Sequence, residues 1–188
     1  MLRWKADLYE RVGIPFAAYD VYDEILRGYT DVANKPAILL RAGRLAVDIG
    51  RYNEAERHLG SLVKTYPGAP QAPEGKLLLG EALVRQGRQE EGEALLTQVA
   101  ESNANNRLGA RAYAALGRMA FDRGDYATAL ELLNRRLKSG TTSEGNDEIL
   151  LMLAEGYRAT NRMQEAQDAL RDIIRFFPES ASAPQAYI

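Results

Sequence analysis

The sequence repeats itself every 37 residues. A short turn-like stretch, typified by the residues that follow Gly50, returns at a constant interval along the chain. The related turns begin at Gly13, Gly50, Gly87, Gly124 and Asn161, each 37 residues after the one before. An internal period of about 20–50 residues is typical of chains built from stacked units, each of which contacts mainly its neighbours. The period therefore predicts a row of similar units.

Apolar residues on both sides of each turn have helical spacing. Before the turn at Gly50, Leu39, Ala42 and Ala46 lie at i, i+3 and i+7, on one face of a helix. A second amphipathic pattern starts at Ala55. Glycine or asparagine at the turn can take the left-handed conformation that ends a helix. Each unit is therefore predicted to be two helices joined by a tight turn, and no period-two alternation predicts a β-sheet.

Small residues recur at fixed distances from the turn. Seven residues before it stand Ala6, Gly43, Gly80, Gly117 and Ala154, and five residues after it stand Ala18, Ala55, Gly92, Ala129 and Ala166. Glycine inside a helix costs about 0.5–1 kcal/mol relative to alanine. Its recurrence here therefore predicts that the two helices of a unit pack very closely.

Two further marks complete the pattern: a large apolar residue nine positions after each turn, and proline seventeen after it at Pro67 and Pro178. Together with the small residues, they resemble the tetratricopeptide repeat. The resemblance covers nearly the whole chain and implies an all-α, right-handed superhelical solenoid of about five helix-turn-helix repeats. The connections at 66–72 and 177–181, longer than in the usual repeat, resemble those of bacterial cell-envelope scaffold proteins.

The turns also define the domain organisation. Aligned on them, the chain divides into repeats at 1–32, 33–69, 70–106, 107–143 and 144–180, with a truncated repeat at 181–188. We expect one solenoid domain over 1–188. Because the sequence opens and closes inside a repeat, we also expect it to be a fragment of a longer protein.

The residue types that carry catalysis are scarce. The chain has no cysteine, and its one histidine, His58, has no second histidine with which to bind a metal. A glycine-rich stretch at 68–76 lacks the Ser or Thr of a phosphate-binding loop. We therefore predict no enzyme, no cofactor and no metal site, and a structural, hydrogen-bonded role for His58.

The charges alternate along the array. The net charge is −2, and the five repeats alternate in the sign of their own net charge. This pattern disfavours nucleic acid as a partner, because a nucleic-acid surface needs a continuous basic face. Six residues before the turns the series runs Asp7, Arg44, Glu81, Arg118 and Glu155. We expect these residues to pair with their equivalents in neighbouring repeats, Arg118 with Glu81 and Glu155.

A helix needs about 18 consecutive apolar residues to span a bilayer, and the sequence contains no such stretch. We therefore expect no direct membrane insertion. The compartment stays open between the bacterial periplasm or cell envelope, which the resemblance favours, and the cytoplasm.

The resemblance further implies that one face of the first helices lines a concave groove. We expect a non-catalytic scaffold that binds a protein or peptide segment there, with apolar anchors and with arginines that orient acidic groups. The expected groove residues are Leu40, Arg44, Val47, Leu77, Glu81, Val84, Arg118, Phe121, Leu151 and Arg158. The alternatives are a self-assembling module that forms a homo-oligomer, and an accessory domain of a larger enzyme or of a secretion or envelope complex.

Overall fold

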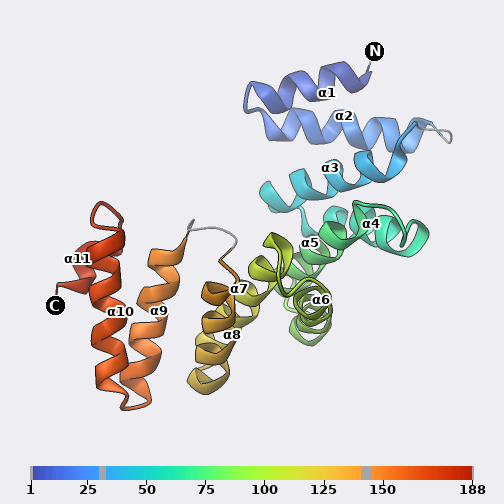
Figure 1. The fold of residues 1–188 in the computed structure, drawn as a ribbon. Coiled ribbons are helices and arrows are strands. Elements are labelled where there is room, and N and C mark those ends of the chain that lie inside the picture. Colours follow the sequence, from blue (N-terminus) through green and yellow to red (C-terminus); the bar gives the residue numbers. More distant parts are fainter. Residues whose placement is uncertain (1, 30–32, 141–144, 188) are drawn as a thin grey trace. The chain divides into compact units, whose positions relative to one another are not determined.

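The described part of the chain is entirely helical. The computed structural model describes residues 2–29, 33–140 and 145–187, in which eleven α-helices and no strand occur (Figure 1). The helices are α1 (Leu2–Arg11), α2 (Pro15–Gly28), α3 (Lys35–Asp48), α4 (Tyr52–Thr65), α5 (Ala72–Arg85), α6 (Gln89–Ser102), α7 (Arg107–Asp122), α8 (Tyr126–Lys138), α9 (Asn146–Ala159), α10 (Met163–Phe176) and α11 (Ala183–Ala186). The all-α prediction is confirmed.

The repeated turn has one backbone conformation throughout. The residues at which it begins all have positive φ, between 60° and 83°: Gly13, Gly50, Gly87, Gly124 and Asn161. At Gly50, the N–H of Arg51 donates to the carbonyl of Ala46 at 2.7 Å, which closes the end of α3. Such a left-handed residue is the usual end of a helix, and glycine adopts it without a steric penalty. The second helix starts two residues later.

The glycines inside the first helices allow the close packing predicted from the sequence. A Cβ atom on Gly43 would lie 2.4 Å from the side chain of Leu59, and one on Gly117 would lie 2.6 Å from Leu133. Both distances are far below van der Waals contact. The leucine nine residues after the turn therefore fits against the bare backbone of its own partner helix.

The chain divides into two compact units, residues 1–96 and 97–188. In the first unit, each helix from α1 to α5 packs on the next one, and α3 also contacts α5. Its core is formed by apolar side chains of these helices, among them Tyr22, Ile38, Leu59 and Leu62. Tyr66, directly after α4 and before Pro67, packs against the same core.

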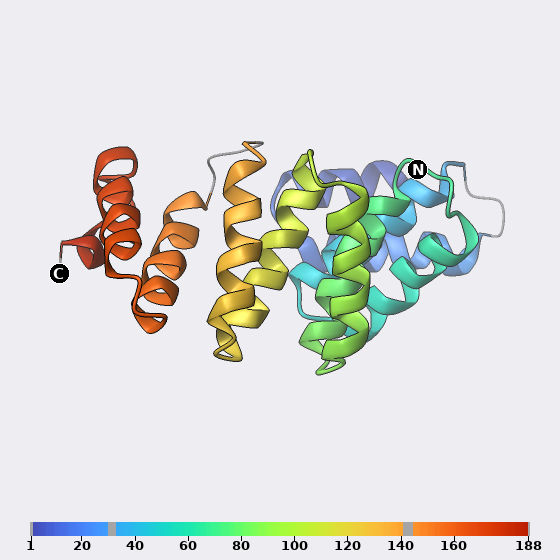
Figure 2. The same ribbon diagram turned by 60° about the horizontal axis from the view of Figure 1, so that its bottom comes forward.

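In the second unit, α7 packs on α8, α8 on α9 and α9 on α10, and the short α11 packs on α10. Figures 1 and 2 show α9 and α10 side by side as one helical hairpin. One cluster of buried residues joins α8 to α9 through Leu130, Leu133, Ile149 and Leu153. A second cluster joins α9, α10 and α11.

Candidate functional site

The expected groove residues of the first unit fall into two groups. Leu40 is 8% exposed and Leu77 is fully buried, so both side chains belong to the core. Val47 is half-buried against the same core, and a Cβ on Gly92 would lie 2.6 Å from Val84, which places Val84 between α5 and α6. Two of the expected apolar anchors of the groove, Leu40 and Leu77, are therefore not available at the surface. Arg44, by contrast, is exposed.

In the second unit, the expected apolar residues are half-buried and the arginines are exposed. The ring of Phe121 meets the ring of Tyr126 edge-on, with 5.4 Å between centroids and an angle of 77° between planes. Tyr126 therefore packs between α7 and α8. Leu151 packs against the cluster of α9 and α10. Arg118 and Arg158 reach solvent.

The exposed arginines pair with carboxylates one repeat further along, but in a different register from the one expected. Nη2 of Arg44 lies 2.5 Å from Oε1 of Glu74, and Nη2 of Arg118 lies 3.1 Å from Oε2 of Glu148. Both glutamates lie thirteen residues before their turn instead of six. Helical side chains lean toward the N-terminus of their helix, so each arginine reaches the first turn of the next first helix.

Glu74 and Glu148 were not predicted, although the sequence carries a signal for them. They lie two helical turns before Glu81 and Glu155, and thus on the same face of their helices. Arg118 was expected to pair with Glu81 and Glu155, and its side chain contacts Glu148. Ion pairs between repeats are therefore present as predicted, and those of Arg44 and Arg118 are made with Glu74 and Glu148.

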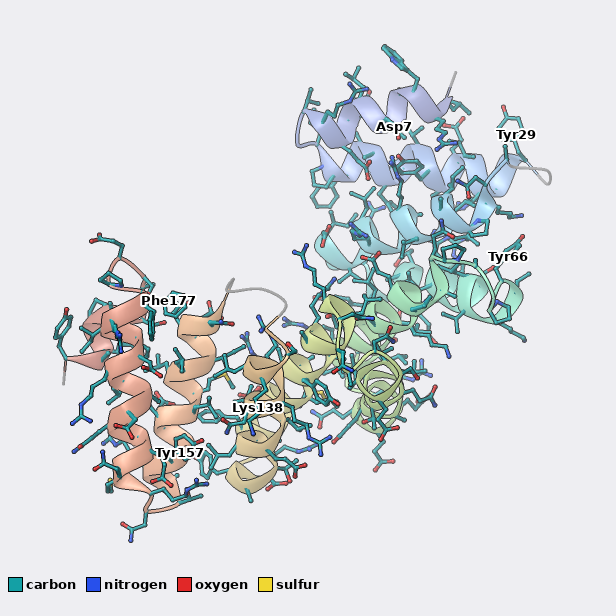
Figure 3. All side chains as sticks on the ribbon, viewed as in Figure 1. Asp7, Tyr29, Tyr66, Lys138, Tyr157 and Phe177 are labelled. Carbon is teal, nitrogen blue, oxygen red and sulfur yellow. The ribbon has the colours of Figure 1, made fainter. Side chains whose placement is uncertain are left out.

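A denser polar network joins the first three helices. The hydroxyl of the buried Tyr22 donates to Oδ1 of Asp7 at 2.6 Å, on the side of α1 that faces α2 (Figure 3). Nη1 of Arg41 lies 2.8 Å from the same hydroxyl and 3.1 Å from Oε2 of Glu10. Burial, and then the hydrogen bond to Asp7, raise the pKa of Tyr22 well above its usual value. The hydroxyl therefore stays neutral and acts as a fixed donor.

His58 has the structural role predicted for it. Its side chain is 3% exposed, and Nε2 lies 3.1 Å from Oδ1 of Asp23. Arg57 and Arg27 reach the two oxygens of the same carboxylate, both at 2.6 Å. Burial, followed by the positive charge of Arg57, lowers the pKa of His58 to about 4. The ring is thus neutral at physiological pH.

In the described part of the chain, no group of three or more His, Cys, Asp or Glu side chains is arranged to hold a metal ion. None of the described helices combines the length and the apolar character required to cross a membrane.

The closely packed hairpins and the left-handed turn at a constant interval define an α-helical repeat protein. Two models of the tetratricopeptide repeat match the sequence, one over residues 40–107 and 77–144 and the other over residues 120–186. The chain belongs to the tetratricopeptide repeat family. In general terms, this family places it among protein-interaction scaffolds.

Solved structures resemble the chain over nearly its whole length. MamA has 20% sequence identity and a TM-score of 0.74, with 90% of this chain and 92% of MamA covered. PilW, a type IV pilus biogenesis factor, has 17% identity and a TM-score of 0.78, with 97% and 80% covered. A tetratricopeptide repeat protein of Thermus thermophilus has 22% identity and a TM-score of 0.62, with 99% and 95% covered. At these identities the similarity shows the fold. No curated protein matches the chain by sequence.

Proposed function

We propose that the chain is a non-catalytic scaffold that binds acidic segments of a protein partner along the first helices of its units. One observation carries the proposal: Arg44 and Arg118, which are two repeats apart, have the same environment. Their side chains are 50% and 57% exposed, and each contacts a glutamate of the next first helix through one nitrogen. A guanidinium has five N–H donors in a planar fork, so donors remain for a partner carboxylate.

The neighbouring residues on each helix support the same partner chemistry. Val47 and Phe121 follow the two arginines by three residues, which puts an apolar side chain beside each guanidinium on one helical face. Both are half-buried. A partner segment with acidic residues next to apolar ones would complement such a pair. In the last full repeat, Leu151 and Arg158 are two helical turns apart and extend the set.

We also propose a setting in the bacterial cell envelope. The long connections between repeats support it, as does the fold similarity to PilW, a protein described as a widely conserved type IV pilus biogenesis factor. Expression with epitope tags followed by fractionation into periplasm, membrane and cytoplasm tests this part. Recovery in the cytoplasm alone would contradict it.

The interaction is tested with a binding peptide and charge-neutral variants. Peptides selected from a displayed random library against the whole chain are expected to be rich in Asp and Glu. Arg44→Gln with Arg118→Gln should weaken their binding about tenfold or more. Removing the arginine from a charge pair that is desolvated in the complex leaves the peptide carboxylate without a partner.

A matched control uses Arg162→Gln with Arg171→Gln. These arginines are also exposed and paired with carboxylates, but they precede or lie on a second helix, α10. Peptide affinity should be unchanged in this control. Full binding by the Arg44 and Arg118 double variant, with the helical content unchanged by circular dichroism, would rule out the proposed surface.

Self-assembly is the second candidate, and the apolar side of the first hairpin favours it. Leu8 is 37% exposed, whereas its equivalent in the next repeat, Leu45, is 7% exposed. Other exposed apolar residues nearby are Trp4, Val12, Ile14 and Phe16. We propose that a second copy covers this side. Sedimentation velocity should then show a dimer whose fraction rises with protein concentration. Trp4→Lys with Leu8→Lys should abolish this dimer. A monomer at all concentrations would exclude this candidate.

A further inference from the structure

We infer that the first unit has a second binding site, on its second helices, for an extended protein segment that presents an arginine or lysine side chain. This site goes beyond the proposed function. It uses α2 and the start of α4 instead of the first helices, and it selects the opposite charge.

The site is a hollow between these two helices. A pocket of about 520 Å³ lies there, and its lining includes Tyr19, Asp20, Asp23, Glu24, Arg27, Arg51 and Glu54. A second hollow of about 510 Å³ shares Arg51 and Glu54 and continues past Tyr52 to Gln86. Two adjoining hollows that cross the start of α4 suit an extended chain better than one compact small molecule.

The charges of the lining leave two carboxylates available. Oδ1 of Asp20 is 3.0 Å from Arg51, and Asp23 is held by Arg27, Arg57 and His58. Glu24 and Glu54 form no ion pair with any residue in the described ranges. Glu54 lies in the first turn of α4, where a negative charge suits the helix dipole. Glu24 lies inside α2, where the helix dipole does not stabilise a negative charge.

An unsatisfied group in the wall of the pocket is independent of these acids. Tyr19 lines the pocket and is only 2% exposed, and within the described part of the chain its hydroxyl has no hydrogen-bond partner. The guanidinium of Arg57 donates to Asp23 at 2.6 Å and also lies near this hydroxyl. Burial raises the pKa of Tyr19, and Arg57 lowers it against this larger effect. A buried hydroxyl without a partner costs about 1–3 kcal/mol, so it is rarely left unused. A donor from an incoming guanidinium or ammonium group would satisfy it.

The protein already places one cation in this environment. The guanidinium of Arg51 lies 5.0 Å from the centre of the Tyr19 ring and 5.8 Å from that of Phe16, with Asp20 as its counter-ion. Aromatic faces beside carboxylates attract organic cations. Arg51 therefore shows the type of contact that the rest of the pocket offers around Glu24 and Glu54. Within the described residues no metal-binding cluster competes for the site.

The test uses the whole 188-residue chain and two heptapeptides of glycine and serine, one with a central arginine and one with a central citrulline. Citrulline keeps the shape of the side chain and removes its charge. In amide ¹H–¹⁵N spectra, the arginine peptide should shift the signals of Tyr19, Glu24 and Glu54. Its affinity should exceed that of the citrulline peptide about tenfold.

Variants separate this site from general electrostatics and from the first-helix surface. Glu24→Gln with Glu54→Gln should remove the preference for arginine. The control, Glu90→Gln with Glu101→Gln, makes the same charge change at exposed positions of α6 and should keep the preference. So should Arg44→Gln with Arg118→Gln, which disables only the surface proposed above.

Three results would overturn the inference: no binding of the arginine peptide at millimolar concentration, equal binding of the two peptides, or an unchanged preference in the Glu24 and Glu54 variant. Each of these leaves the first-helix proposal standing, since that proposal is measured with acidic peptides.

Discussion

One repeat position carries a charged group in the first unit and a neutral one in the second. Asp23 on α2 and Asn134 on α8 both lie ten residues after their turn, three repeats apart. Asp23 holds two arginines and His58, and so connects α2 to α4. Asn134 donates through Nδ2 to the carbonyl of Leu130 at 2.7 Å and to the hydroxyl of Tyr157 at 2.9 Å, and so connects α8 to α9.

The two positions show that a repeat array can join its hairpins by either chemistry without changing its backbone. A carboxylate with several cationic neighbours brings titration into the structure. An amide bonded to a carbonyl and a hydroxyl does not. The acid sensitivity of the chain should therefore be concentrated in the first unit, and the following changes test that difference.

The largest expected effect is the pH dependence caused by His58. Its folded pKa is about 4, below the usual 6.5, because the ring is buried. As the pH falls through 6.5, His58 binds a proton in the unfolded chain, whereas in the folded chain it stays neutral down to about pH 4. The first unit should therefore lose about 3 kcal/mol between about pH 7 and about pH 4.

His58→Leu should remove this loss. Leucine is the residue of the third and fourth repeats at this place, Leu95 and Leu132, so it suits the position. Amide hydrogen exchange in α2 and α4, measured at a series of pH values, reports the stability of this unit. Parallel pH profiles for the two proteins would contradict the assignment.

Asn134→Asp should cost the second unit about 2 kcal/mol near neutral pH. The new carboxylate would face the carbonyl of Leu130, and two acceptors repel each other. This environment raises the pKa of the new carboxyl, so its penalty should shrink as the pH falls toward 4. Urea unfolding at two pH values measures the effect, and Asn134→Ala, which adds no charge, is its control.

Asp23→Asn should have a smaller effect, about 1 kcal/mol, in the first unit. Arg57 and Arg27 have side chains that are 48% and 66% exposed, so they can return to water. The amide can still accept a hydrogen bond from His58. Asp20→Asn, at an exposed ion pair, should change the urea midpoint by less. A larger loss at Asp20 than at Asp23 would contradict this ranking.

Gly60→Ala should stabilise the chain by about 0.5–1 kcal/mol. Gly60 is the member of the same repeat position in the second repeat, inside α4, and a Cβ there would meet no atom within 4 Å. Gly43→Ala is the opposing control, because its Cβ would lie 2.4 Å from Leu59. Thermal unfolding should show a rise for the first variant and a fall for the second.

The fold was largely predictable because its determinants are local. A turn residue with positive φ, a glycine under a leucine and a proline after the second helix each act within one hairpin. Asn161 shows this well: its place in the series predicts a left-handed turn, and its φ is 60°.

The candidate site was less predictable because it depends on how far one helix covers the next. Leu40 and Leu77 have the right spacing for an exposed face, yet both are buried. Arg136 is an arginine near the end of α8, and nothing in its sequence position indicates that it is only 4% exposed, where burial lowers its pKa. Offsets within a helix define its faces, and only the packed neighbours decide which face meets water.

The packing of each helix on its close neighbours along the chain has a mechanical consequence. Within each unit, the described helices that pack extensively on one another are one or two places apart along the chain. A force applied at one end would therefore load one hairpin at a time, and the outermost pair could detach and rejoin while the next pair stays folded. Under tension, the distance between the ends of each unit would therefore increase in steps, one hairpin at a time.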